Sequence, residues 1–233
     1  MPSRYAIPLH QQISEMLIRE IAAGRIIDGE KLPTEKEMAA SLGIAVGTLR
    51  MALADLEQKG LLERIQGSGN YVRSRPDVES IYAMFRLELV EGGGLPTAQV
   101  LSVERLPKPS DMPAFGCSSE GHCIRRLRSL GGRPAAVEEI WLDGSCAEHI
   151  GVEELADSLY LFYRQALDIW IVRAEDRIGL GNVPAWAPSE FGLSSGVPVG
   201  FIERIGWDRS GASVEFSRTW FNHSVARYVS RLR

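Results

Sequence analysis

The stretch Leu32-Pro33-Thr34-Glu35-Lys36-Glu37-Met38-Ala39 predicts the start of a short helix. Thr34 and Glu37 have the spacing of a capping box. In that motif the hydroxyl accepts the backbone N–H three residues on, and the carboxylate accepts the N–H of the capping residue. Gly43 is the expected end of this helix, because glycine readily takes the left-handed conformation that closes a helix. A tight turn is expected to follow it.

Amphipathic helices are predicted on both sides of this short helix. The upstream helix is predicted to end near Gly24 and the downstream helix at Gly60, each glycine following the last apolar residue of its pattern. Apolar residues recur at intervals of three and four, the period of a helix with one buried face. These residues are Leu9, Ile13, Met16, Leu17 and Ile21 in the upstream helix and Leu49, Leu53 and Leu56 in the downstream helix.

A β-hairpin is predicted directly after Gly60. Its strands are Leu61–Ile65 and Asn70–Val72, and its tip is the glycine-rich Gln66-Gly67-Ser68-Gly69. Three helices with a tight turn before the third, followed by a hairpin, form a winged helix-turn-helix. In such domains the first residues of the third helix face the base edges in the major groove of DNA. Those residues are Val46, Gly47, Thr48 and Arg50. The alternative is a small helical domain that binds a protein.

Residues 5–73 resemble the DNA-binding domain of GntR-family transcriptional regulators. Three segments carry the resemblance: Pro8–Ile13, Leu32–Ala39 and Gly60–Val72. The resemblance implies that Lys36, Thr48 and Arg50 contact DNA, together with the wing tip Gln66, Gly67 and Ser68. The chain departs from the family pattern at Ala45-Val46, where members usually have Ser-Arg, and at Ser68, where they usually have a basic residue.

Composition divides the chain into two domains of a soluble protein. It has 233 residues, of which 45% are hydrophobic and 24% are charged, with a net charge of −4. No stretch approaches 18 consecutive apolar residues and the N-terminus lacks a signal peptide, so no membrane location is expected. Three cysteines suit a reducing cytoplasm. All five tryptophans follow residue 75. The expected domains are 1–74 and 96–233. Residues 75–95 are expected to form a linker and a leading segment, because Arg73–Asp77 has the composition of a linker.

The second domain is predicted to be α+β, built around an antiparallel sheet. One hairpin joins 123–130 to 135–142 through the turn Gly131-Gly132-Arg133-Pro134, and a second joins 199–207 to 212–221. Helices are expected over Val152–Leu155 and Leu159–Tyr163, the latter capped by Ser158. Alternation along a strand places Arg126 and Arg128 on one face. If the first hairpin is symmetric about Gly132, Glu138 lies opposite Arg126.

Two arginines on one strand face with a carboxylate opposite suit a small anion that also carries donor groups. Guanidinium forks match carboxylate or phosphate, and a glutamate accepts hydrogen bonds from hydroxyl or amine groups. The alternative is a solvated strand face with an ordinary cross-strand ion pair.

Residues 80–230 resemble the UTRA effector domain of the HutC subfamily, which has a chorismate-lyase-like fold. The resemblance rests on Arg126-Leu127-Arg128, Gly132-Arg133-Pro134 with Glu138, Asp157–Tyr160 and Glu215-Phe216-Ser217. It implies that a pocket is lined by several of these residues and by Phe221, where several members carry Tyr. The implied ligand-binding residues are Arg126, Arg128, Glu138, Ser158, Tyr160, Glu215 and Phe221.

The sequence therefore predicts a ligand-responsive transcriptional regulator rather than an enzyme. We expect a homodimer on a palindromic, double-stranded DNA operator, and a repressor released by a small anionic metabolite. No catalytic residue, cofactor or metal site is predicted, since Cys117 and His122-Cys123 lack a second spaced pair of ligands. The competing hypotheses are an enzyme that acts on a small acid through the chorismate-lyase-like domain, and an adaptor that binds proteins.

Overall fold

The computed structural model describes residues 7–73, 82, 84–155 and 158–231. Two compact units divide the chain: Leu87–Tyr228 forms one, and Ile7–Arg86 with the residues from Val229 onward forms the other. Most of the linker expected over Arg73–Asp77 lies outside the described residues.

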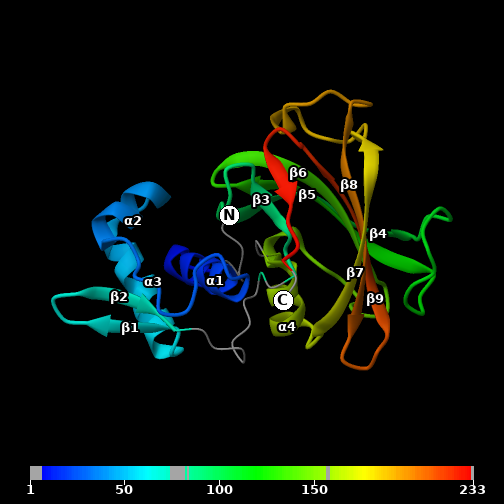
Figure 1. The fold of residues 1–233 in the computed structure, drawn as a ribbon. Coiled ribbons are helices and arrows are strands. Elements are labelled where there is room, and N and C mark those ends of the chain that lie inside the picture. Colours follow the sequence, from blue (N-terminus) through cyan, green and yellow to red (C-terminus); the bar gives the residue numbers. More distant parts are fainter. Residues whose placement is uncertain (1–6, 74–81, 83, 156–157, 232–233) are drawn as a thin grey trace. The chain divides into compact units, whose positions relative to one another are not determined.

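The first unit contains the predicted winged helix-turn-helix (Figure 1). Thr34 and Glu37 form the complete capping box, and Gly43 closes the second helix in the left-handed conformation. The first helix ends two residues before Gly24. Ile13 and Leu17 of the first helix and Leu53 of the third are almost fully buried and form the core, whereas Leu9, the first residue of the predicted stripe, is 44% exposed. The elements are α1 (Leu9–Ala22), α2 (Glu35–Leu42), α3 (Val46–Gln58), β1 (Leu62–Ile65) and β2 (Gly69–Val72).

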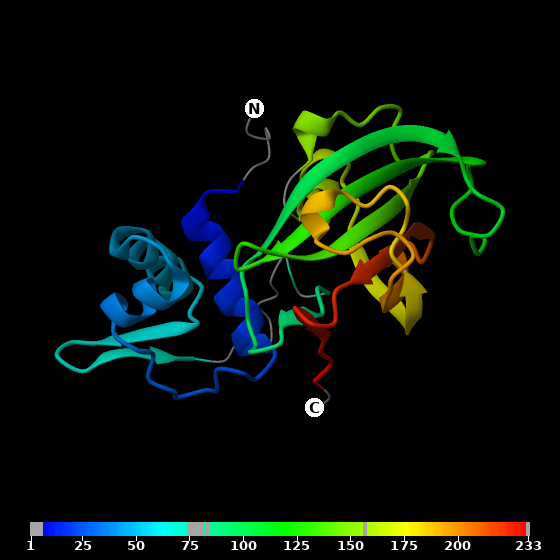
Figure 2. The ribbon, with the colours of Figure 1, turned by 90° about the horizontal axis from the view of Figure 1, so that it is seen from above.

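The second unit contains a six-stranded antiparallel sheet with the order β4-β5-β6-β9-β8-β7. Figure 2 shows its long strands curving across the domain. A separate pair joins β3 to β10. The strands are β3 (Leu87–Leu89), β4 (Pro96–Pro107), β5 (Glu120–Leu130), β6 (Arg133–Asp143), β7 (Ile171–Asn182), β8 (Pro198–Asp208), β9 (Ser213–Phe221) and β10 (Ala226–Tyr228).

The hairpin β5–β6 has the predicted register, with Arg126 opposite Glu138. A β-bulge between Arg128 and Ser129 shifts the pairing by one residue, and this shift is confined to the residues next to the turn. The predicted symmetry about Gly132 therefore holds through the body of the hairpin, where the charged residues lie.

One face of the sheet is covered by α4 (Leu159–Ala166), whose first turn Ser158 caps by accepting the backbone N–H of Leu161. Phe162 and Tyr163 of α4 pack there against apolar residues of β5 and β6, including Ile124 and Ile140. The helix predicted over Val152–Leu155 is shorter and tighter than expected. That segment contains only the 3₁₀ turn η1 (Val152–Glu154), after which Leu155 is extended. The other short 3₁₀ turn is η2 (Ser189–Phe191).

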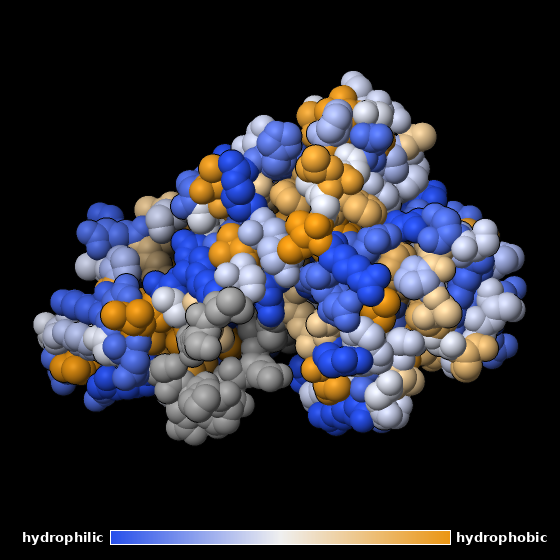
Figure 3. Space-filling model, turned by 45° about the vertical axis from the view of Figure 1, so that its right-hand side comes forward, coloured by the Kyte–Doolittle hydropathy of each residue, from blue (hydrophilic) through white to orange (hydrophobic). Residues whose placement is uncertain are grey.

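No single helix in the described part of the chain is long and apolar enough to cross a membrane. Only when α2 and α3 are taken together is their combined length and composition sufficient, and the two helices are bent by 109° relative to each other. On the side drawn in Figure 3, hydrophilic and hydrophobic residues are interspersed over the surface.

Candidate functional sites

The first candidate site is the N-terminal end of α3. Leu49 is fully buried in the core, whereas Gly47 and Arg50 are exposed and Val46 and Thr48 are half-buried. The predicted DNA-facing residues therefore lie on the side of the helix away from its apolar stripe. Ala45 precedes the helix without a side-chain hydrogen bond to cap it.

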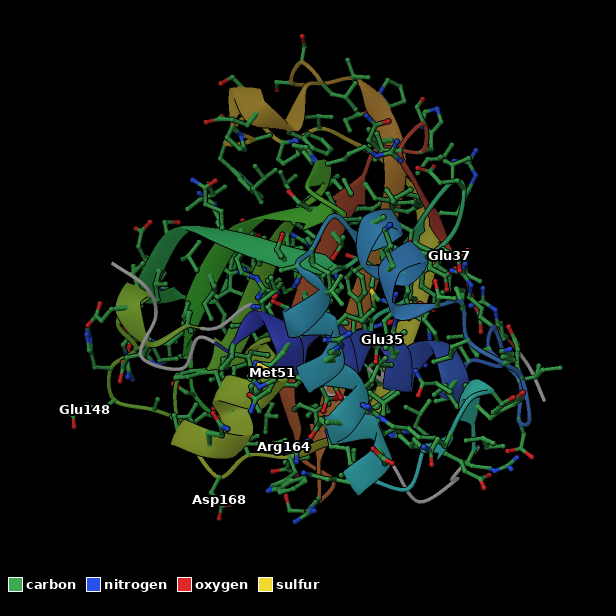
Figure 4. The ribbon with its side chains drawn as sticks, turned by 90° about the vertical axis from the view of Figure 1, so that its left-hand side faces the viewer. Glu35, Glu37, Met51, Glu148, Arg164 and Asp168 are labelled. Atoms are coloured by element: carbon green, nitrogen blue, oxygen red, sulfur yellow. The ribbon has the colours of Figure 1, made fainter. Side chains whose placement is uncertain are left out.

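Arg50 is held by an acidic residue of the neighbouring helix. Its Nε donates to Glu35 Oε2 at 2.6 Å, and its side chain is 64% exposed. Figure 4 shows Glu35 and Glu37 near the start of α2, with Met51 on α3. Because an exposed ion pair contributes little stability, a DNA phosphate or a guanine edge is able to replace Glu35 as the partner of Arg50.

A hollow of about 540 Å³ separates the start of α2 from the wing formed by β1, β2 and their turn. It is lined by the predicted wing-tip residues Gln66, Gly67 and Ser68. Lys31 and Arg64, which the sequence analysis did not single out, line it as well. Lys31 bridges to Tyr71 of β2, so the segment before α2 is attached to the wing. The exposed side chain of Lys36 lies on α2 and is not part of this lining.

The second candidate site is a buried ion cluster on the face of the sheet that α4 covers. Arg126 donates to Glu138 at 2.7 Å, while Arg128 donates to both oxygens of that carboxylate at 3.3 and 3.1 Å. The exposed fractions of the three side chains are 4%, 4% and 9%. Two buried cations therefore share one carboxylate.

The neighbouring arginines keep Glu138 ionised. Burial by itself raises the pKa of a carboxyl group, because it disfavours the charged form. Arg126 and Arg128 outweigh that effect through their charges and hydrogen bonds and lower the pKa of Glu138 to about 2.

Glu215 on β9 forms a second part of the same buried region. The hydroxyl of Tyr160 donates to Glu215 Oε1 at 2.9 Å. Burial raises the pKa of Glu215, and the Tyr160 hydrogen bond opposes that rise only in part. The charge of Arg126 also lowers this pKa, so the two parts of the site interact. Among the described residues, Glu215 Oε2 and the buried hydroxyl of Tyr163 make no hydrogen bond of normal geometry, although Tyr163 interacts with Glu215 and also lowers its pKa. Such buried groups are available to a ligand.

Three residues of this region, Tyr163, Arg204 and Asp176, were missed in the sequence analysis. Arg204 on β8 forms a two-point ion pair with Asp176 on β7, with N–O distances of 2.5 and 2.7 Å. Burial lowers the pKa of Arg204, but Asp176, Tyr160 and Glu215 together outweigh this effect and the net shift is upward. Arg204 lies opposite Ser217 of β9, which is two residues from Glu215. Residues two apart on a strand share a face, so strand alternation places Arg204 on the same face of the sheet as Glu215. Asp176 carried no such signal because β7 was not predicted.

The two remaining predicted residues are both buried. Ser158 is buried and caps α4, as predicted. Phe221 is buried, and its ring lies directly over Gly200 on β8, where a Cβ would come within 2.1 Å of it. Any side chain at position 200 would therefore displace the Phe221 ring.

The cysteine and histidine side chains near Cys117 do not converge. Cys117 is exposed beside Ser145, Cys123 is buried in an apolar cluster, and His122 contacts the carbonyl of Ala147. Among the described residues no group of three or more His, Cys, Asp or Glu side chains is placed to hold a metal ion.

Comparisons with known proteins assign both domains to families. Residues 9–72 match the family "Bacterial regulatory proteins, gntR family". Residues 91–227 match the family "UTRA domain". The second match covers more than half of the chain, and together the two cover nearly all of it.

Three relatives are transcriptional regulators, and each matches this chain over nearly its whole length. The chain is 61% identical over 228 residues to the HTH-type transcriptional regulator SmoD of Agrobacterium fabrum, covering 98% of this chain and 97% of that protein. It is 26% identical over 235 residues to the HTH-type transcriptional repressor NagR of Bacillus subtilis, covering 97% and 96%. It is also 26% identical to the mannosyl-D-glycerate transport/metabolism system repressor MngR of Escherichia coli over 226 residues, covering 92% of each.

Solved structures share the fold. The possible transcriptional regulator YydK from Bacillus subtilis matches with a TM-score of 0.54 and 20% identity, over 97% of this chain and all of that one. PhnF from Mycobacterium smegmatis matches with a TM-score of 0.51 and 18% identity, over 97% and 99%. The relatives SmoD, NagR and MngR are transcriptional regulators and not enzymes, so the enzyme hypothesis is set aside. The chain belongs to the GntR family of bacterial regulatory proteins and is a transcriptional regulator with an N-terminal winged helix-turn-helix and a C-terminal UTRA domain.

Proposed function

We propose that the buried cluster of Arg126, Arg128 and Glu138 binds the anionic group of a small metabolite, and that this binding controls attachment to DNA. The observation that carries the proposal is the sharing of one carboxylate by two buried guanidinium groups. Buried charges are stable only when they are paired. An incoming carboxylate, phosphate or other oxyanion matches these guanidinium groups and competes with Glu138 for them.

The part of the region around Glu215 is proposed to select for hydrogen-bond donors on the metabolite. Glu215 Oε2 accepts a hydrogen bond from a hydroxyl or amine group, and the Tyr163 hydroxyl, which interacts with Glu215, offers a further polar group beside it. Tyr160 orients Glu215 through its hydrogen bond. The proposed effector is therefore a small polar metabolite with an acidic group at one end.

In the proposed mechanism, a homodimer presents two winged helix-turn-helix domains to the two halves of a palindromic operator in the cytoplasm. The effector binds one arrangement of the dimer more tightly than the other, and it shifts the population between them. The coupling free energy between effector and operator sites is expected to be about 1–3 kcal/mol, which changes operator affinity about 5- to 150-fold. The protein is proposed to act as a repressor that the effector releases.

The test is selection of bound sequences from random duplex DNA, repeated with fractionated small metabolites. A palindromic sequence that is retained by the protein and released by an acidic fraction supports the proposal. Release by neutral compounds alone would contradict the assignment of an anion. If the protein binds no DNA at any salt concentration, the proposal that it recognises an operator is wrong.

Arg50→Ala is expected to weaken operator binding by about 1–3 kcal/mol, because the variant loses the exposed guanidinium at the start of α3. Operator affinity is measured at fixed salt by fluorescence anisotropy. Arg105→Ala is the control, since Arg105 is an exposed arginine of the UTRA domain that is also paired with a glutamate. Equal affinities for Arg50→Ala and the wild type would remove Arg50 from the DNA surface.

Val46→Arg is expected to tighten binding to generic duplex DNA and to steepen its salt dependence by about one counterion. The new cation would stand at the end of α3 where GntR-family members usually have arginine. The slope of log affinity against log salt concentration measures the effect. An unchanged slope would show that residue 46 does not face the phosphates.

A further inference from the structure

Met51 is a large apolar residue that α3 leaves exposed (Figure 4). Its exposed fraction is 55%. Met51 lies two residues after Leu49 and two before Leu53, and both leucines are almost fully buried in the core. Two helical residues correspond to a rotation of about 200°. Met51 therefore lies on the side of α3 opposite the apolar stripe, which is the side that a recognition helix turns toward the major groove.

The surface one helical turn before Met51 is open. Gly47 lies four residues earlier, and residues four apart share one face of a helix. Gly47 is exposed, and a Cβ at this position would meet no atom within 4 Å. Long helical side chains lean toward the N-terminal end of their helix. The bare surface at Gly47 therefore gives the thioether of Met51 room to contact a base edge near the start of α3.

This face of α3 is poor in hydrogen-bonding groups. Ala45 and Gly47, both exposed, have no polar side-chain atom, and the thioether of Met51 is only a weak acceptor. In the major groove every base pair presents hydrogen-bond donors or acceptors, and thymine also presents its 5-methyl group. Met51 has no donor with which to recognise the polar groups. The methyl group of thymine is the feature of the groove that an apolar side chain contacts favourably.

We propose that Met51 is a specificity-determining residue, which selects operators with thymine at one position of each half-site through contact with the 5-methyl group. The proposal rests on the operator binding of the proposed function and adds a second kind of recognition to it. Arg50 binds a phosphate or a guanine edge through its guanidinium, whereas Met51 recognises a methyl group by burying it. The unbranched, polarizable side chain of methionine adapts its shape to such a contact.

The first experiment uses an operator duplex obtained by the selection from random DNA. Each thymine is replaced in turn by uracil, which keeps the base pairing and lacks only the methyl group. For the wild type, one such replacement per half-site is expected to weaken binding about fourfold, which corresponds to one buried methyl group. For Met51→Ala the same replacement is expected to cost about twofold or less, because the contact is already lost. Equal costs in both proteins at every thymine would overturn the proposal.

The second experiment compares operator affinity and its salt dependence. Met51→Ala is expected to weaken binding about fourfold or more without changing the slope of log affinity against log salt concentration, because methionine carries no charge. Met51→Leu keeps an apolar side chain and is expected to retain most of the preference for thymine over uracil. Ile27→Ala is the matched control and is expected to bind like the wild type, since Ile27 is 61% exposed and lies between α1 and α2. Equal losses in Met51→Ala and Ile27→Ala would contradict the proposal.

These outcomes separate the thymine contact from the proposed function. A melting temperature near the wild-type value is expected for Met51→Ala, since the side chain is exposed and alanine favours the helix. If Arg50→Ala weakens operator binding while Met51→Ala binds with wild-type affinity and uracil replaces thymine without loss, the thymine contact alone is wrong. A wild-type chain that binds no duplex DNA would contradict both the operator and its recognition by Met51.

Discussion

Glu138→Gln is expected to lower the free energy of unfolding by about 3–5 kcal/mol, because removing one partner of a buried ion pair leaves uncompensated charge behind. In this chain the loss affects two guanidinium groups, since both Arg126 and Arg128 donate to Glu138. Urea denaturation at neutral pH measures the change. An effect below about 1 kcal/mol would show that water reaches these arginines in the folded protein.

Glu139→Gln is the matched control. Glu139 is the next residue of β6, lies on the opposite face of the sheet and also pairs with an arginine of β5, Arg125. The Arg125 side chain is 33% exposed, so solvent screens it once its partner is lost. A much smaller destabilisation, about 1 kcal/mol or less, is expected. If Glu138→Gln and Glu139→Gln lower the free energy of unfolding equally, burial of the Arg126–Arg128–Glu138 cluster does not increase the cost of losing its carboxylate.

The pH dependence gives this prediction a second measurement. The pKa of Glu138 is about 2 in the folded protein, against 4.5 for an ordinary glutamate. A carboxyl group with a lowered folded-state pKa contributes stability that is fully present above its unfolded pKa and is lost as the pH falls. The difference in stability between the wild type and Glu138→Gln should therefore be constant above about pH 5 and shrink between pH 4.5 and 2. A constant difference down to pH 2 would contradict an ionised Glu138.

Arg126→Ala and Arg128→Ala are each expected to weaken effector binding about tenfold or more. The loss of a charge-assisted hydrogen bond in a desolvated pocket costs about 1.5–3 kcal/mol, and 1.4 kcal/mol corresponds to a factor of ten. Either variant keeps one arginine paired with Glu138, so the carboxylate is not left without a counter-charge. Titration calorimetry with an anion that releases the protein from its operator measures the affinity.

Two further variants separate charge from geometry. Arg128→Lys keeps the positive charge but loses the planar fork, so an intermediate affinity is expected if the anion is bound at two points. Arg125→Ala removes an arginine from the other face of the sheet and is expected to bind the effector like the wild type. If Arg126→Ala and Arg128→Ala both bind and respond like the wild type, the effector site lies elsewhere.

The sequence by itself determined the features that depend on neighbours in the chain. The capping box of Thr34 and Glu37 and the glycine closing α2 identified the helix-turn-helix, because caps satisfy backbone groups within one turn. The pairing of Arg126 with Glu138 followed from a tight turn, because a short hairpin connection fixes the register of its strands. These local rules predicted both domains and the central charged pair.

Local rules also explain why the helix predicted over Val152–Leu155 is shorter than expected. Val152–Leu155 has glutamates that suit a first helical turn, and Gly151 N–H does bond to Glu154. The segment forms only a single 3₁₀ turn, and Leu155 is buried in the core beside α4. A short segment follows its tertiary contacts rather than its propensity, because one turn of helix does not repay its own nucleation.

Only the tertiary structure decided which charges are buried together. Arg204 and Asp176 lie on β8 and β7, so their two-point ion pair exists only because these strands lie side by side in the sheet. Tyr163 reaches the region through α4, which packs across the sheet. The pairing of Arg50 with Glu35 likewise depends on the packing of α2 against α3. Each of these contacts joins separate elements, and its geometry is set by packing and desolvation, for which a single sequence carries no periodic signal.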